Sequence, residues 1–102
     1  MNARKEFLDF VAETGAQVKC ACIEYRGGSK DKSYLLKFGY SDAEYEAFLS
    51  SLAFYYDDGY GGQQLYGVIW FTDGTWAERE EYDGSEWWEH MVRPAIPKEL
   101  KK

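Results

Sequence analysis

The most constraining feature of this sequence is an Asp73-Gly74 pair that separates two runs of strand-forming residues. Residues 64–72 are rich in Val, Ile, Trp, Tyr and Phe, and a second such run follows the pair. Asp-Gly between two such runs strongly indicates a two-residue type I′ turn, in which both central residues have positive φ. This turn predicts that Phe71 pairs with Trp76 and Ile69 with Glu78. One face would then carry Leu65, Ile69, Phe71, Trp76 and Tyr82, and the other Tyr66, Val68, Trp70 and Ala77.

The first forty residues predict a helix followed by a hairpin. Residues 3–14 place apolar side chains at helical spacing, and Gly15 stands where a helix C-cap is expected. Residues 17–26 and 33–38 alternate with period two, and residues 27–31 between them read as a hairpin loop. In the first of these strands, we expect Val18, Cys20 and Cys22 on one face and Lys19, Ala21, Ile23 and Tyr25 on the other.

A second helix is predicted to begin at Ser41 and to run to about Ala53. Ser41 and Glu44 have the spacing of a capping box, in which each side chain bonds to the other residue's backbone N–H. Apolar residues then recur at i, i+3, i+4 and i+7, which gives the helix one buried stripe. Its members are Tyr45, Phe48, Leu49 and Leu52.

The rest of the chain predicts a glycine-rich acidic loop at residues 57–62 and a short helix near the C-terminus. The helix would start at residues 83–86 and hold Trp87, Trp88 and Met91. Residues 93–97 must be extended because their two prolines disfavour both helix and sheet pairing. The predicted fold is therefore α+β, in the order α-β-β-α-β-β plus a short C-terminal helical turn, with about four antiparallel strands and two main helices. Residues 1–97 would form one domain and residues 98–102 a frayed basic tail.

Length and composition exclude several classes of protein. With 102 residues, of which 19% are aromatic, the chain suits a single folded domain. It contains no apolar run of about 18 residues that would span a membrane, and its first residues do not resemble a signal peptide. We therefore expect a cytoplasmic protein. Cys20, Cys22 and His90 together supply fewer ligands than a structural zinc site needs. We therefore expect the two cysteines to be reduced thiols that are buried as small apolar side chains.

The charge is distributed unevenly along the chain. Residues 41–89 contain twelve acidic side chains and one basic side chain, a net charge of −11, whereas residues 1–40 carry +2 and residues 90–102 carry +3. These acids either keep an aromatic-rich protein soluble or form a surface that meets a basic partner. Such a surface would repel the phosphates of nucleic acid but would fit a protein that holds nucleic acid.

The sequence gives less support to catalysis or to the binding of a small ligand. The chain has one histidine and lacks a phosphate-binding glycine loop, a nucleophile elbow or a metal-ligand motif, so we expect neither an enzyme nor a cofactor. Glu78 and Glu80 share a strand face but lie in a domain too small for a deep cleft. Asp57 and Asp58 could hold calcium, although the loop lacks the EF-hand pattern. Tyrosines beside this loop could bind a sugar or form a contact with a basic protein.

Three segments in the last third of the chain form a distinctive pattern. The segments are residues 69–76 (IWFTDGTW), 81–89 (EYDGSEWWE) and 94–97 (PAIP), within about a third of the chain. This pattern is similar to small uncharacterised proteins encoded by tailed bacteriophages and prophages. The resemblance implies an accessory protein that acts in the host cytosol by binding and blocking a host protein, such as a defence nuclease.

The leading hypothesis is a non-catalytic phage accessory protein of the anti-CRISPR or anti-restriction type. It would use an acidic surface to block a basic host protein, without binding nucleic acid or a membrane itself. The alternative is a small self-assembling module whose aromatics form the interface and whose acids serve solubility. The expected partner-binding residues are Asp57, Asp58, Tyr60, Glu78, Glu80, Glu81, Asp83, Glu86 and Trp88.

Overall fold

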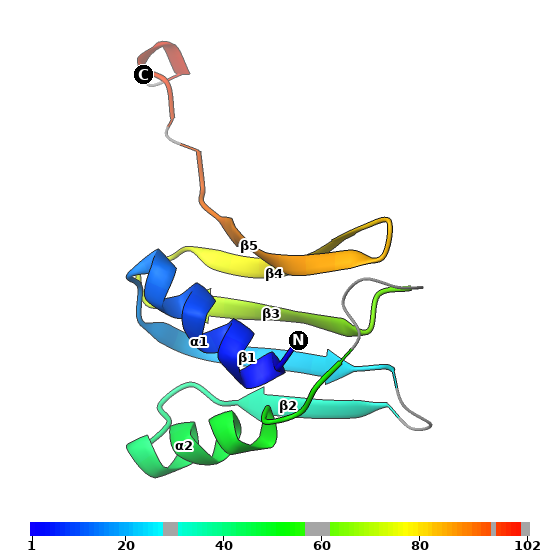
Figure 1. Cartoon of the computed structure of the whole chain (residues 1–102). Coiled ribbons are helices and arrows are strands. Elements are labelled where there is room, and N and C mark those ends of the chain that lie inside the picture. The colour runs from blue at the N-terminus through cyan, green and yellow to red at the C-terminus, as the bar shows by residue number, and fades with distance from the viewer. Residues whose placement is uncertain (28–30, 57–61, 95, 101–102) are drawn as a thin grey trace.

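The protein is an α+β fold in which two helices cover one face of a five-stranded antiparallel sheet. The computed structural model describes residues 1–27, 31–56, 62–94 and 96–100. The strands are ordered β2-β1-β3-β4-β5, and β3 is central (Figure 1). The predicted fold class is confirmed, with one strand more than expected. The elements are α1 (Ala3–Thr14), β1 (Val18–Tyr25), β2 (Lys32–Leu36), α2 (Asp42–Ser51), β3 (Leu65–Phe71), β4 (Trp76–Tyr82), β5 (Ser85–Met91) and a 3₁₀ turn, η1 (Lys98–Leu100).

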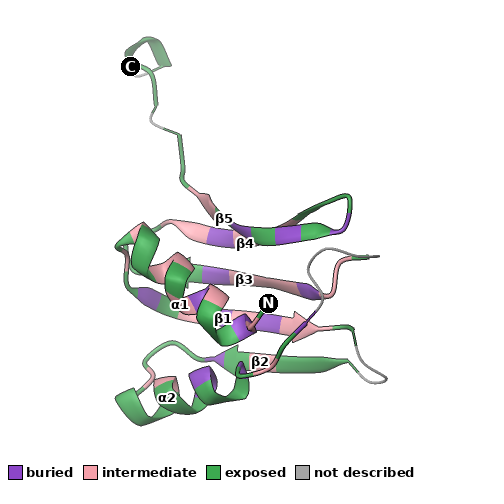
Figure 2. Ribbon diagram, in the orientation of Figure 1, coloured by how far each residue is buried: buried purple, intermediate pink, exposed green. Residues whose placement is uncertain are grey.

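The core lies between the helices and one face of the sheet. Phe7 of α1 and Phe48 of α2 meet edge to face with ring centroids 5.5 Å apart, so both helices share this layer. Buried and exposed positions alternate along the strands beneath them (Figure 2). The fully buried large side chains are Phe7, Ile23, Leu52, Leu65, Ile69 and Phe71. In the part of the chain that the structure describes, no helix covers the opposite face.

Local signals place both helices correctly. Gly15 ends α1 in the left-handed conformation, with φ 67°. The capping box of α2 forms as predicted: Glu44 N–H donates to Ser41 Oγ (3.2 Å), and Ser41 N–H donates to Glu44 Oε1 (3.1 Å). The helix ends at Ser51, two residues before the expected end. The loop predicted at residues 27–31 falls largely on residues 28–30, which lie outside the described residues.

The turn between β3 and β4 differs from the prediction by one residue. Gly74 has φ 87°, whereas Asp73 is not among the residues with positive φ, so this turn is not type I′. Phe71 N–H donates to the Thr75 carbonyl (2.9 Å), which leaves a three-residue loop between them. The Asp73 carboxylate stabilises this loop by accepting bonds from the backbone and hydroxyl of Thr75.

This shift changes which side chains of β4 face the core. Ile69 pairs with Ala77, and Trp70 pairs with Trp76, in place of the predicted pairing of Ile69 with Glu78. Because side chains alternate along a strand, the shift turns Ala77 into the core and Trp76 to the helix-free face. The prediction that Trp76 shares a face with Ile69 is therefore wrong.

A second Asp-Gly pair forms the two-residue turn that was expected at the first. Asp83 and Gly84 both have positive φ (53° and 88°), and Tyr82 pairs with Ser85 across them. The chain therefore returns beside β4 as strand β5. The predicted short helix over Trp87, Trp88 and Met91 is wrong, because β4 provides a free edge on which this aromatic-rich segment pairs.

An irregularity in β1 corrects the expected position of Val18 and of the two cysteines. The register shifts between Val18 and Cys20, which brings Val18 to the helix-covered face beside Ala21 and Ile23. Cys20 and Cys22 lie on the helix-free face. They are unbonded thiols that are half-buried rather than buried as predicted.

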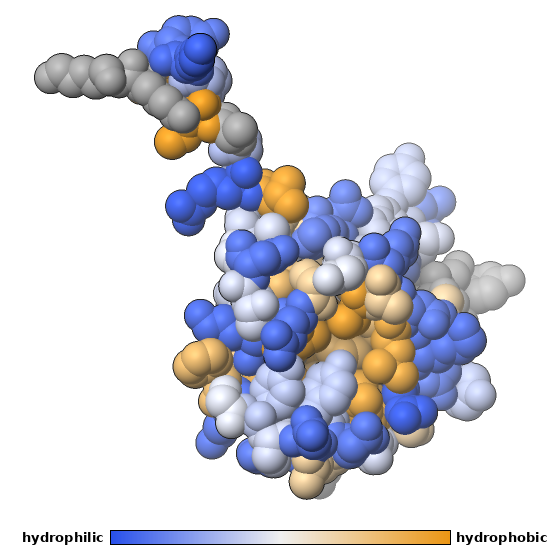
Figure 3. Space-filling model, turned by 90° about the vertical axis from the view of Figure 1, so that its left-hand side faces the viewer, coloured by the Kyte–Doolittle hydropathy of each residue, from blue (hydrophilic) through white to orange (hydrophobic). Residues whose placement is uncertain are grey.

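The chain leaves the sheet after Met91 and extends away from the body (Figure 1). In Figure 3 this extension stands clear of the body and carries apolar side chains of its own. Val92, Ile96 and Leu100 are its exposed apolar residues.

Replacement of Gly67 by alanine is expected to destabilise the fold. Gly67 lies in β3 with φ 154°, and a Cβ there would come within 2.4 Å of the Cys22 carbonyl oxygen of β1. Because that neighbour is backbone, the two central strands would have to separate, at a cost of about 1–3 kcal/mol. Urea unfolding of Gly67→Ala measures this loss. Gly62→Ala is the control, because nothing lies within 4 Å of its added Cβ; equal stability of the two variants would contradict the prediction.

Candidate functional site

The predicted site residues gather on the β4–β5 hairpin as far as the structure describes them. Glu78, Glu80 and Glu81 lie on β4, and Asp83 lies in the turn. Glu86 and Trp88 lie on β5. The other three expected residues, Asp57, Asp58 and Tyr60, are outside the described residues, as is most of the loop predicted at residues 57–62.

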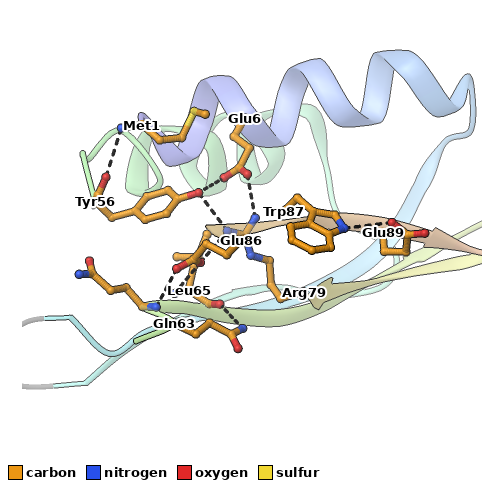
Figure 4. Close-up of polar contacts among 10 residues, drawn as sticks. Met1, Glu6, Tyr56, Gln63, Leu65, Arg79, Glu86, Trp87 and Glu89 are labelled. Atoms are coloured by element: carbon orange, nitrogen blue, oxygen red, sulfur yellow. Dashed lines mark hydrogen bonds and ion pairs between the residues drawn. The ribbon is translucent and has the colours of Figure 1, made fainter. Parts of the chain in front are cut away.

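A buried arginine on the inner face of this hairpin forms ion pairs with two glutamates (Figure 4). The side chain of Arg79 is 1% exposed, and its Nη2 donates to the fully buried carboxylate of Glu86 (2.6 Å). Its Nη1 donates to Glu6 of α1 (3.0 Å). Glu86 also accepts the backbone N–H groups of Gln64 (2.8 Å) and Leu65 (3.0 Å). Arg79 and Glu86 therefore join β4, β5, α1 and the start of β3.

Tyr56 completes this network from the segment that follows α2. Its hydroxyl accepts from Arg79 Nη2 (2.9 Å) and donates to Glu6. Burial and the bond to Glu6 raise the pKa of Tyr56, so its neutral form persists. Burial by itself would lower the pKa of Arg79, but the charge of Glu6 and the hydrogen bond to Glu86 outweigh burial and raise it. The network is ionised at Arg79 and has a structural role.

Two of the expected contact residues are therefore excluded from the surface. Glu86 is 6% exposed because its carboxylate is used by Arg79 and by two backbone amides. Trp88 is also 6% exposed, and its ring packs 5.0 Å from the guanidinium of Arg79. Both residues are buried in the free chain and are not the exposed contacts that the sequence predicted. Arg79 is the one basic residue in residues 41–89, and this was the sequence signal for a buried ion pair with one of the acids.

The exposed side of the hairpin carries a set of acidic and aromatic side chains. Glu78 of β4 lies directly opposite Glu89 of β5, and Glu80 lies opposite Trp87. Like charges placed directly opposite on a sheet repel each other. Trp87 Nε1 donates to Glu89 (3.1 Å), which holds that carboxylate beside the indole. We call this surface the acidic hairpin face; it consists of Trp76, Glu78, Glu80, Tyr82, Trp87 and Glu89.

The carboxylates of this surface lack positive partners in the described chain. The ion pairs among the described residues are Lys5–Asp9, Arg26–Glu24, and Arg79 with Glu6 and Glu86. None involves the acids of the acidic hairpin face or the neighbouring Glu81 and Asp83. Sequence reasoning anticipated Glu78 and Glu80 but missed Trp87 and Glu89, because it placed both residues on a helix.

His90 is linked by hydrogen bonds to the turn between β3 and β4. Its Nε2 lies 2.9 Å from Thr75 Oγ1, and this hydroxyl donates to Asp73 (2.5 Å). Thr75 Oγ1 therefore lies between the His90 ring and the Asp73 carboxylate. The rings of Phe71 and Phe10 pack edge-on against His90. This histidine therefore ties β5 to the β3–β4 turn.

Searches for metal sites and membrane-spanning helices in the described residues, and for similar proteins, each gave a negative result. Among the described residues, no group of three or more His, Cys, Asp or Glu side chains is placed to hold a metal ion, and no helix is long and apolar enough to cross a bilayer. No protein-family model, curated protein or solved structure matches this chain.

Replacement of Arg79 by methionine is expected to cost about 3–5 kcal/mol of unfolding free energy, because it leaves the buried carboxylate of Glu86 without its positive partner. Chemical unfolding at neutral pH measures the loss. Arg26→Met is the matched control, because Arg26 pairs with Glu24 at the surface; it should leave the unfolding midpoint unchanged. Similar midpoints for both variants would show that the buried network is not required.

Proposed function

We propose that this protein is a non-catalytic binding protein whose acidic hairpin face engages a basic surface of another protein. The observation that carries the proposal is the direct opposition of Glu78 and Glu89 beside exposed aromatic rings. This pairing costs stability in the free protein, and a cation placed between the two carboxylates would relieve it. Trp87 is 38% exposed and Tyr82 is 76% exposed, so both can stack against arginine side chains.

The charge of the surface favours a protein partner over nucleic acid. The acids of the acidic hairpin face would repel phosphates, whereas they complement lysine and arginine side chains. The resemblance of about residues 66–97 to small phage proteins supports a bacterial host as the location of that partner. A host protein that handles nucleic acid, such as a defence complex, presents a basic groove that this acidic surface can occupy in place of phosphates.

Self-assembly through aromatic and apolar side chains is the second candidate function. Trp70 and Leu35 are exposed (43% and 60%) on the helix-free face, next to the half-buried Val68 and Cys22. An interface of this kind would bury apolar area and would persist at high salt. Binding through the acidic hairpin face would weaken with salt, so salt dependence separates the two functions.

The proposed function predicts that Glu78→Gln/Glu80→Gln loses the partner while the fold becomes as stable or more stable. Neutralising Glu78 removes its repulsion with Glu89, a gain of about 0.2–1 kcal/mol. The measurement is affinity capture from bacterial lysate at low salt and at ~0.5 M salt, where the Debye length falls to about 4 Å. A discrete basic protein should be captured by the native chain at low salt and lost from this variant.

Asp31→Asn/Glu46→Gln is the control, because it removes two charges at exposed positions outside the hairpin. It should capture the same protein as the native chain. Equal capture by Glu78→Gln/Glu80→Gln would contradict the proposal.

A further inference from the structure

A groove runs between α1 and the edge strand β5. It comprises two adjoining hollows of about 390 and 250 Å³, and both are lined by Phe10, Glu13 and Trp88. The rings of Phe10 and Trp88 lie 6.4 Å apart. Asp9, which also pairs with Lys5, lines one hollow from α1. Glu89 borders the other from β5, with its carboxylate bonded to Trp87. The groove therefore combines aromatic walls with an acidic rim.

One buried group in the wall of this groove has an unmet hydrogen bond. Trp88 is 6% exposed, and its indole Nε1 has no hydrogen-bond partner among the described residues. That nitrogen is itself buried, so the groove presents the ring of Trp88 rather than its N–H. The acids of the rim favour a positively charged ligand. An extended basic peptide with apolar residues supplies positive side chains for the rim and apolar contacts for the rings.

The chain itself contains a segment with these properties. Residues 93–98 read Arg-Pro-Ala-Ile-Pro-Lys, with two prolines three positions apart and a basic residue on each side. Polyproline II helices repeat every three residues, so both prolines fall on one side of such a helix. Proline-rich segments of this pattern bind aromatic-lined grooves, because their conformation is already ordered before binding. Residues 90–102 carry a net charge of +3, opposite to that of residues 41–89.

The extension is long enough to lie along the groove. In the free chain, however, it points away from the groove of its own molecule. Residues 92–97, which precede η1, would span about 19 Å as a polyproline II helix, and the seven-residue strand β5 is about 23 Å long. In the structure the extension points away from the body (Figure 1), and its apolar side chains Val92 and Ile96 are exposed. The groove of the same molecule is therefore left open to a second copy.

We propose that the C-terminal extension of one molecule binds in the α1–β5 groove of a second molecule as a polyproline II helix. Arg93 and Lys98 pair with the acidic rim, and the prolines and Ile96 pack on Phe10 and Trp88. The contact is between two different surfaces, so it closes into a dimer if the exchange is reciprocal and otherwise extends into a chain.

Two charge-reversed variants test this contact by sedimentation. Arg93→Glu/Lys98→Glu reverses the extension, and Asp9→Lys/Glu13→Lys reverses the rim. The native chain should associate at ~50 mM salt and dissociate toward its monomer mass of 11.9 kDa at ~0.5 M salt. Each variant alone should be monomeric. An equimolar mixture should associate again, because the reversed extension then meets the reversed rim.

Lys19→Glu/Lys37→Glu is the control, because it reverses two exposed lysines outside both surfaces and should keep association. Circular dichroism and the unfolding midpoint confirm that each variant is folded. A native chain that stays monomeric at high concentration overturns the proposal. So does association that survives in Arg93→Glu/Lys98→Glu, or a mixture that stays monomeric. Glu78→Gln/Glu80→Gln should leave association intact, which separates this contact from the proposed binding of a basic protein.

Discussion

The buried ion pair between Arg79 and Glu86 is the interaction on which the rest of the structure depends. A charge taken out of water is costly unless it is paired and hydrogen-bonded, so each neighbour of this pair is constrained. Glu6 brings α1 to the pair, Tyr56 brings the segment after α2, and two backbone amides bring the start of β3. Without the pair, β5 would lose its side-chain links to Arg79 and to the start of β3.

The placement of this pair also explains the surface that we propose as functional. Side chains alternate along β4 and β5, so turning Arg79 and Glu86 inward turns Glu78, Glu80 and Glu89 outward. Both helices cover the inner face, and the outward acids therefore meet solvent. One arginine satisfies acids inside the core, and the acids on the other face have no such partner among the described residues. The inner side of the hairpin thus holds a positive charge between its acids, whereas the outer side opposes like charges.

The two Asp-Gly pairs show where sequence reasoning reaches its limit. Both pairs indicate turns, and both form turns, but Asp73-Gly74 closes a three-residue loop and Asp83-Gly84 a two-residue one. In the longer loop, the backbone and hydroxyl of Thr75 donate to the Asp73 carboxylate. A shift of one residue reverses the faces of β4. The position of Trp76 therefore could not be predicted from the turn signal alone.

The sequence by itself determined both helices, through the glycine cap at Gly15 and the capping box at Ser41, because these signals act within a few residues. It also determined the α+β class and the concentration of acidic charge in residues 41–89. Only the tertiary structure decided which acid is buried and which acids face solvent. That choice rests on pairing between β4 and β5 and on contacts of Arg79 with Glu6, which is 73 positions away in the chain. Such contacts leave no periodic pattern in the sequence, since they exist only once the sheet and α1 have packed together.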